Sequence, residues 1–149
     1  MFNEKENGLL QDLKKSEQLC VEKYKKYENE AAAPQLKELC RQIGSTEQGH
    51  LQTICKVMQG ETPSMGGSQN SQQPIEAADY SGKDESFNKD KYICNDALST
   101  EKHVSSVYDT CIFEFKNPAV RNILNHIQKE EQGHGEKLYN YMAQNNMYS

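Results

Sequence analysis

The chain contains two copies of the tetrapeptide Glu-Gln-Gly-His, at residues 47–50 and 131–134, which lie 84 residues apart. A further glutamate precedes each copy by 30 residues. Residues three apart on a helix are neighbours, so each Glu-x-x-His pair can direct a carboxylate and an imidazole at one point. Two such helices, with one glutamate from each of two others, make the ligand set of a dinuclear carboxylate site in a helix bundle. The predicted metal ligands are Glu17, Glu47, His50, Glu101, Glu131 and His134.

These four carboxylates and two imidazoles fall on the apolar seams of their helices, where burial of unpaired charge is costly. Two divalent cations would balance the four carboxylates with both histidines neutral. Oxygen-rich ligation with one imidazole per metal suits iron or manganese better than zinc. We therefore predict two Fe or Mn ions, with Fe slightly preferred. Each would be held by its own Glu-x-x-His pair and by Glu17 or Glu101. Bridging by some of the carboxylates is expected, although the sequence does not say which.

A metal-free buried polar network is the alternative, because a single Glu-x-x-His pair is common in helices. Redox turnover is a separate hypothesis. A dinuclear site with open positions could act as an oxidase, peroxidase or catalase on peroxide or dioxygen. That activity would need no catalytic residues beyond the ligands and no organic cofactor.

Several further residues could support the site. Tyr24 and Tyr108 lie seven residues after Glu17 and Glu101, and either pack as core tyrosines or donate a hydrogen bond to a ligating carboxylate. Gly49 and Gly133 lie inside predicted helices at a cost of about 1 kcal/mol relative to alanine. Their repetition suggests that a side chain would block close helix approach or access to the metals. We expect Glu130 to be a solvated neighbour of Glu131, and His103 and His126 to be surface residues.

An internal repeat defines the elements that must position these residues. Residues 9–58 align without a gap on residues 93–142. Apolar residues recur at alternating spacings of three and four, which predicts two helices in each unit. Pro34 and Pro118 suit the first position of the second helix of each unit. The sequence thus predicts an all-α four-helix bundle made of two duplicated antiparallel hairpins.

The 149 residues are expected to form a single domain. Hairpin 1 spans about residues 5–58 and hairpin 2 about residues 91–144. Residues 59–90 between them are rich in Gly, Ser, Gln and Pro and lack a sustained period, which indicates a loop. A helix of ~25 residues is about 37 Å long. A long crossover of this kind can therefore return along the bundle to the start of the next hairpin.

Composition excludes several other classes of function. The net charge of −5, without a Lys/Arg cluster, argues against nucleic-acid binding. No apolar run approaches the ~18 residues of a membrane span, and the N-terminus lacks an apolar signal region, so we expect cytoplasmic synthesis. Five scattered cysteines without a C-x-x-C motif are typical of reduced, packed thiols. The alternative is a redox or cross-linking thiol, best placed at Cys55 or Cys94.

The six-ligand pattern resembles the ferritin-like di-iron/di-manganese superfamily over residues 4–58 and 91–144, which implies a ferritin-like bundle. The chain lacks the Cys₄ module of a rubrerythrin, the length of a manganese catalase and the fifth helix of a ferritin. Residues 95–148 are similar to the coat F family of bacterial spore coat proteins. The stretches that carry this second similarity are residues 108–110, 114–118, 128–134 and 139–148.

The second resemblance implies a spore-forming Gram-positive source, a place in or near the spore coat, and other coat proteins or further copies of the chain as partners. The leading expectation is a spore-coat-type protein with a dinuclear iron or manganese centre that handles peroxide or oxygen. The alternative is a non-catalytic structural coat component that uses the bundle for assembly.

Overall fold

The computed structural model describes residues 1–65 and 74–148. These residues form four α-helices and no strands, which confirms the all-α prediction at that level. The remaining part of the predicted crossover, residues 66–73, lies outside the described residues. The helices are α1 (Glu4–Glu30), α2 (Pro34–Met58), α3 (Asp84–Glu114) and α4 (Pro118–Gln144).

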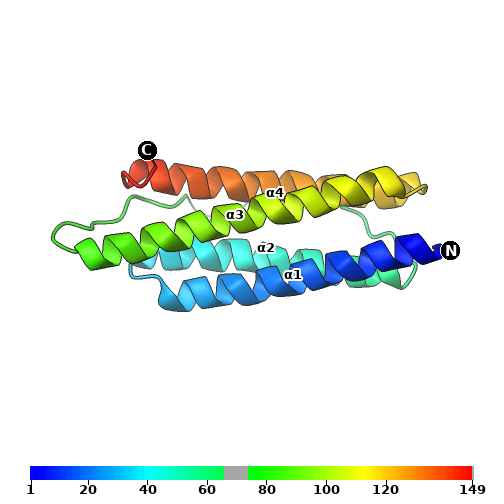
Figure 1. Ribbon diagram of the computed structural model, residues 1–149, viewed down its shortest axis with the longest axis horizontal. Helices are drawn as coiled ribbons and strands as arrows, with labels where there is room; N and C mark the ends of the chain where they lie inside the picture. The colour runs from blue at the N-terminus through cyan, green and yellow to red at the C-terminus, as the bar shows by residue number, and fades with distance from the viewer. Residues whose placement is uncertain (66–73, 149) are drawn as a thin grey trace.

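The four helices lie side by side in two antiparallel pairs (Figure 1). Short turns at residues 31–33 and 115–117 join α1 to α2 and α3 to α4. Helix α1 also packs beside α3, and α2 beside α4. Helices α2 and α3 run in the same direction, so α3 begins at the end of the bundle opposite to the end of α2 (Figure 1).

Local sequence explains where the helices begin. Asn3 and Glu6 form a capping box at the start of α1, with the Glu6 backbone N–H donating to Asn3 Oδ1 at 2.7 Å. Pro34 and Pro118 occupy the first helical positions of α2 and α4, as predicted. Asn117 caps α4 by accepting a hydrogen bond from the Ala119 N–H.

Helix α3 begins at Asp84, about seven residues earlier than predicted, so residues 84–90 do not belong to the crossover. This added segment includes Asp90, which is completely buried. Its carboxylate accepts hydrogen bonds from the Ala32 and Ala33 backbone N–H groups at 2.7 and 2.9 Å. It also accepts one from the Tyr80 hydroxyl at 2.7 Å. These bonds hold the first turns of α3 against the turn of the other hairpin.

A weaker contact of the same kind exists at the other end of the bundle. Glu6 of α1 accepts a hydrogen bond at 3.4 Å from the Lys116 backbone N–H, in the turn between α3 and α4. The offset of 84 carries Glu6 onto Asp90 and residue 32 onto Lys116. Each hairpin therefore presents an acidic side chain to the turn of the other hairpin.

Two apolar clusters fill the bundle, one toward each end. One cluster, which includes Tyr24, Leu36 and Leu138, lies toward the turn at residues 31–33. The other, which includes Leu13, Val104 and Ile127, lies toward the turn at residues 115–117. The six predicted ligands belong to neither cluster and come from the helix segments between them. Within the described ranges, no helix is both long and apolar enough to cross a membrane.

The glycines of the repeated tetrapeptide do not permit close helix approach, so that expectation is wrong. A Cβ atom built on Gly49 or Gly133 meets no atom within 4 Å. The close approach is instead at Gly44 of α2, where a Cβ would lie 3.2 Å from Cβ of Tyr24.

Candidate metal centre

All six predicted ligands lie in one buried layer of the bundle, each at most 4% exposed. Their donor atoms form two overlapping groups, and within each group they lie within 4.8 Å of one another. The first group is Glu17, Glu47, His50 and Glu131, and the second is Glu47, Glu101, Glu131 and His134. Each group thus includes a glutamate from the opposite hairpin, as expected if some carboxylates bridge, although the sequence did not identify which. Glu47 and Glu131 belong to both groups.

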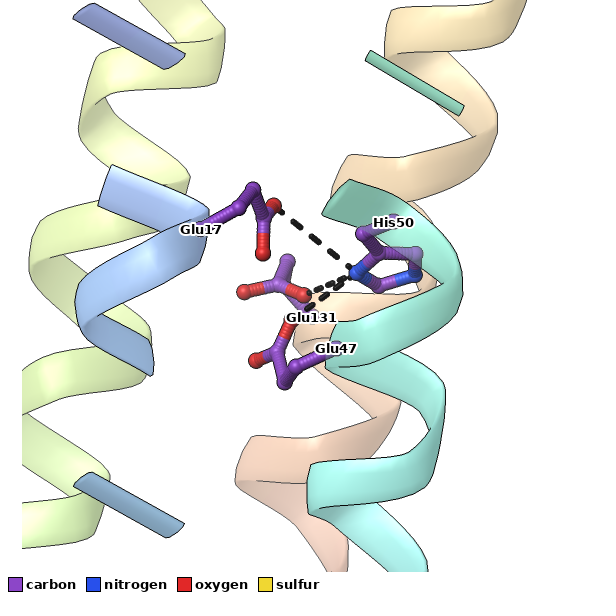
Figure 2. Close-up of side chains that lie close together, drawn as sticks. All are labelled: Glu17, Glu47, His50 and Glu131. Atoms are coloured by element: carbon purple, nitrogen blue, oxygen red, sulfur yellow. Dashed lines mark hydrogen bonds and ion pairs between the residues drawn. The ribbon is translucent and has the colours of Figure 1, made fainter. Parts of the chain in front are cut away.

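The first group surrounds Nδ1 of His50, as Figure 2 shows. This nitrogen lies 2.9 Å from Glu47 Oε1, which is three residues earlier on α2, and 2.9 Å from Glu131 Oε1 on α4. Glu17 reaches in from α1, with Oε2 at 3.8 Å. Three helices therefore aim their side chains at one point.

The second group surrounds Nδ1 of His134 in the same manner but less tightly. The nitrogen lies 3.4 Å from Glu101 Oε1, 3.5 Å from Glu47 Oε2 and 3.7 Å from Glu131 Oε1. The rings of His50 and His134 stack with their centroids 5.9 Å apart. The two groups are thus neighbours that share the carboxylates of Glu47 and Glu131.

The layer contains buried polar atoms with no hydrogen-bond partner, and each such atom typically costs about 1–3 kcal/mol. Among the described residues these atoms come only from the predicted ligands. They are Glu17 Oε1, Glu47 Oε2, Glu101 Oε1, both carboxylate oxygens of Glu131, and His134 Nδ1. Carboxylate oxygens and imidazole nitrogens are the donors that iron and manganese take in proteins. The residues present therefore fit two such cations.

Both candidate tyrosines donate hydrogen bonds to glutamates of this layer. The Tyr24 hydroxyl donates to Glu101 Oε2 at 2.5 Å, and the Tyr108 hydroxyl donates to Glu17 Oε2 at 2.5 Å. Each tyrosine thus reaches the glutamate of the opposite hairpin rather than its own. Because each hydroxyl occupies one carboxylate oxygen, it leaves the other oxygen, Oε1, directed into the layer.

The ionisable groups in this layer have strongly shifted pKa values. Burial, reinforced by the charge of Glu131, raises the pKa of Glu17 to about 7. Burial alone would lower the pKa of His134, but the nearby carboxylates of Glu101 and Glu47 raise it to about 10. Burial also raises the pKa of Glu131 well above its usual range. In the metal-free protein, protons therefore supply the positive charge that the carboxylates require.

Glu130 is not the solvated neighbour that the sequence predicted. Its Oε1 accepts a hydrogen bond at 2.7 Å from the other ring nitrogen of His50, Nε2. Its Oε2 lies 3.2 Å from Nε2 of His126, which is partly exposed. The internal repeat could not reveal this contact, because the offset of 84 places Thr46 at the position equivalent to Glu130. Its position, four residues before His134 and beside a ligand, was the only signal available.

The cysteines fit the packing interpretation better than a redox role. All five are free thiols, and four of them are buried. Burial raises the pKa of Cys94 to about 12, so this thiol resists ionisation to the reactive thiolate. Cys55 is partly exposed near the end of α2.

Comparison with known proteins identifies one region of the chain. Residues 89–149, which are less than half of the sequence, match the Coat F domain family. This agrees with the resemblance of residues 95–148 to the coat F family. The matched region includes Glu101, Glu131 and His134, whereas the other three candidate ligands lie outside it. No curated protein and no solved structure matches the chain.

Proposed function

We propose that this chain is a spore coat protein whose helix bundle binds two iron or manganese ions. The observation that carries the metal proposal is the layer of six buried ligands with unpartnered donor atoms. Apart from ion pairs between these glutamates and the two histidines, five carboxylate oxygens and one imidazole nitrogen lack partners, which would be a heavy cost in a purely structural core. Two divalent cations at this layer would remove that cost and balance the charge of the four glutamates.

The role of each ligand follows from whether it belongs to one or to both of the two groups of donor atoms. Glu47 and Glu131 belong to both groups, so each would help to hold both cations. Glu17 and Glu101 each belong to one group and would bind one cation through Oε1, while a tyrosine holds Oε2. His50 and His134 would each bind through Nδ1, the nitrogen that faces the carboxylates.

The proposed place in the spore coat is supported by the match of residues 89–149 to the Coat F domain family. We propose a ferritin-like bundle, and the helix directions support it, because α2 and α3 run the same way and a long connection must join them (Figure 1). The expected partners are other coat proteins or further copies of the chain.

An iron or manganese pair supplies reversible one-electron chemistry, which suits peroxide or dioxygen as substrate. The protein's own residues would hold the ions in place and shield them from water. Tyr24 and Tyr108 keep the terminal glutamates oriented through buried hydrogen bonds. The apolar clusters on both sides of the layer limit the entry of water.

The second candidate function is a structural coat component in which the bundle serves assembly alone. The Coat F match favours it as strongly as it favours a metal-bearing coat protein, because that match carries no chemistry. Under this alternative, the six-residue layer would remain a protonated polar network without metal.

Elemental analysis separates the two functions. Protein produced with ample iron and manganese is expected to contain about two such ions per chain. The double variant Glu47→Gln/Glu131→Gln should contain almost none. Its matched control is Glu22→Gln/Glu136→Gln, which removes the same formal charge from exposed positions of α1 and α4 and should keep both ions. Wild-type protein without metal would refute the metal proposal.

A second experiment concerns the coat. Spores that carry wild-type protein or the Glu47→Gln/Glu131→Gln variant can be extracted and their coat fractions probed for the chain. We expect both proteins in the coat fraction, and peroxide consumption only by the wild type. Absence of the wild-type chain from the coat would contradict the proposed location. Equal coat assembly with no peroxide or oxygen consumption by either protein would favour the purely structural function.

A further inference from the structure

The two halves of the proposed centre have the same ligands but different groups behind the histidines. Nε2 of His50 donates a hydrogen bond to Glu130, and Glu130 in turn contacts His126 at the edge of the bundle. The offset of 84 places Thr46 at the position of Glu130 and Gln42 at that of His126. Within the described part of the chain, the ion pairs of His134 all run through Nδ1, and none through Nε2 is seen.

A carboxylate on the far nitrogen of a ligating histidine has a known effect. It fixes the tautomer, so that the proton stays on the far nitrogen and the near one is free to bind metal, and it makes that near nitrogen a stronger donor. Loss of such a partner typically lowers metal affinity about 10–100-fold. At His50 the carboxylate of Glu130 holds Nε2, which leaves Nδ1 as the metal-binding nitrogen.

The distances around the two histidines agree with this difference. Nδ1 of His50 lies 2.9 Å from its two nearest carboxylate oxygens, on Glu47 and Glu131. Nδ1 of His134 has no carboxylate oxygen closer than 3.4 Å. The His50 half is therefore the more compact of the two, and its histidine is held from both sides.

We infer that the two metal positions are unequal, that the first divalent cation binds beside His50, and that Glu130 is the positioning residue responsible. This inference rests on the proposed metal function. The His50 position should bind about 10–100-fold more tightly than the His134 position. The bundle would then load its centre in a fixed order.

Removal of one histidine at a time tests the order of loading. Metal-free His134→Ala and His50→Ala variants are titrated with Mn²⁺ alone, by calorimetry and by the electron paramagnetic resonance signal of bound Mn²⁺. The His134→Ala variant is expected to keep the tight first step of the wild type. The His50→Ala variant should show only a step about 10–100-fold weaker. Equal first steps in the two variants would overturn the inference.

Glu130 is then tested in both backgrounds. Glu130→Thr reproduces the residue found in the other half, and it should weaken Mn²⁺ binding about 10–100-fold in His134→Ala but not in His50→Ala. Thr46→Val is the matched control and should change neither. A merely structural role of Glu130 would weaken both backgrounds alike and would refute the positioning role. Glu130→Gln, which keeps a hydrogen-bond acceptor without charge, replaces Glu130→Thr should that variant misfold, with the same expected direction.

The outcomes separate this inference from the metal function on which it rests. Wild-type protein that takes up no Mn²⁺ at all would refute both. Wild-type protein that takes up two ions, with equal first steps in the two histidine variants, would refute the unequal positions and leave the metal function intact.

Discussion

Two of the buried acidic sites in the described bundle differ in how well their polar atoms are satisfied. Asp90, near one end, is completely buried, and its carboxylate accepts hydrogen bonds from two backbone N–H groups and one hydroxyl. Glu131, in the central layer, is equally buried, but within the described chain no backbone N–H or hydroxyl donates to it, and only the ring nitrogens of His50 and His134 pair with its Oε1. Burial of a carboxylate is therefore not by itself a sign of metal binding. Buried polar atoms without hydrogen-bond partners distinguish a site that can bind a ligand from a site that joins two hairpins.

The largest expected loss of stability comes from the satisfied site. Asp90→Ala leaves the Ala32 and Ala33 N–H groups without their acceptor, at about 1–3 kcal/mol each, so we expect a loss of roughly 2–5 kcal/mol in the free energy of unfolding. Urea denaturation measures it, with and without metal. The control, Asp109→Ala at an exposed position of the same helix, should change stability by less than about 0.5 kcal/mol. An Asp90→Ala protein as stable as the wild type would contradict the joining role.

Substitution in the central layer, in contrast, should cost the metal-free protein little stability. In the metal-free protein, Glu131→Gln removes a buried carboxyl whose Oε2 has no partner and whose Oε1 lies 2.9 Å from Nδ1 of His50. The amide oxygen can keep that one contact, so the free energy of unfolding should stay within about 1 kcal/mol of the wild type. The variant should, however, lose the stabilisation by metal, which for a ligand at 100 times its Kd is about 2.7 kcal/mol. Denaturation with and without Mn²⁺ gives both values. Equal stabilisation of wild type and variant by Mn²⁺ would remove the distinction between the two sites.

The pH dependence sharpens the same comparison. The folded-state pKa values of Glu17 (about 7) and His134 (about 10) lie above their ordinary values. The protons on these groups therefore stabilise the metal-free fold at low pH, and this contribution is lost as pH rises through about 7 to 10.

Metal binding displaces those protons, so the stabilisation by Mn²⁺ should grow from pH 6 to pH 8, by about 1.4 kcal/mol per pH unit for each proton released. Thermal unfolding at several pH values, with and without Mn²⁺, measures it. A stabilisation that is constant or falls over this range would contradict the proton exchange.

The tyrosines provide a smaller test of how the central layer is held. Tyr24→Phe or Tyr108→Phe removes the hydroxyl that fixes one oxygen of Glu101 or Glu17. Mn²⁺ affinity should fall about 10-fold, the lower end of the range for such outer partners. Calorimetric titration compares each variant with Tyr139→Phe, a change at an exposed position of α4. Affinities equal to that of Tyr139→Phe would return both tyrosines to a packing role.

The smallest effects concern the glycines. Gly49→Ala has open space around the new methyl group, so it should stabilise α2 by up to about 1 kcal/mol. Gly44→Ala places a methyl group 3.2 Å from Tyr24 Cβ and should destabilise the protein, because Tyr24 must move. Thermal unfolding of the two variants compares them directly. Destabilisation by Gly49→Ala would show that the tetrapeptide glycine has a role beyond local geometry.

The helices and the six central residues were predictable because both depend on regular spacing. Apolar residues at spacings of three and four predicted four helices, and Pro34 and Pro118 predicted where α2 and α4 begin. The start of α3 was predicted too late. The residues before it lack an apolar seam, and the role of Asp90 depends on contacts with the turn of the distant hairpin. Extending the repeat by three residues would have aligned Asp90 with Glu6 and suggested this pairing.

Contacts that break the repeat could not be predicted from it. Glu130 has no acidic counterpart at Thr46, and it reaches His50 across 80 residues of sequence. Nor could spacing alone decide which glutamates are shared between the groups, because this depends on which helices lie beside each other. Only the packed arrangement identifies Glu47 and Glu131 as the shared pair.

The most direct test of the metal proposal is an anomalous difference map from crystals of the protein grown with Mn²⁺ or Fe²⁺. We predict two peaks inside the bundle, one beside Nδ1 of each histidine, both in contact with the carboxylates of Glu47 and Glu131. A map with no peak at this layer, or with peaks only at the surface, would contradict the proposed dinuclear centre.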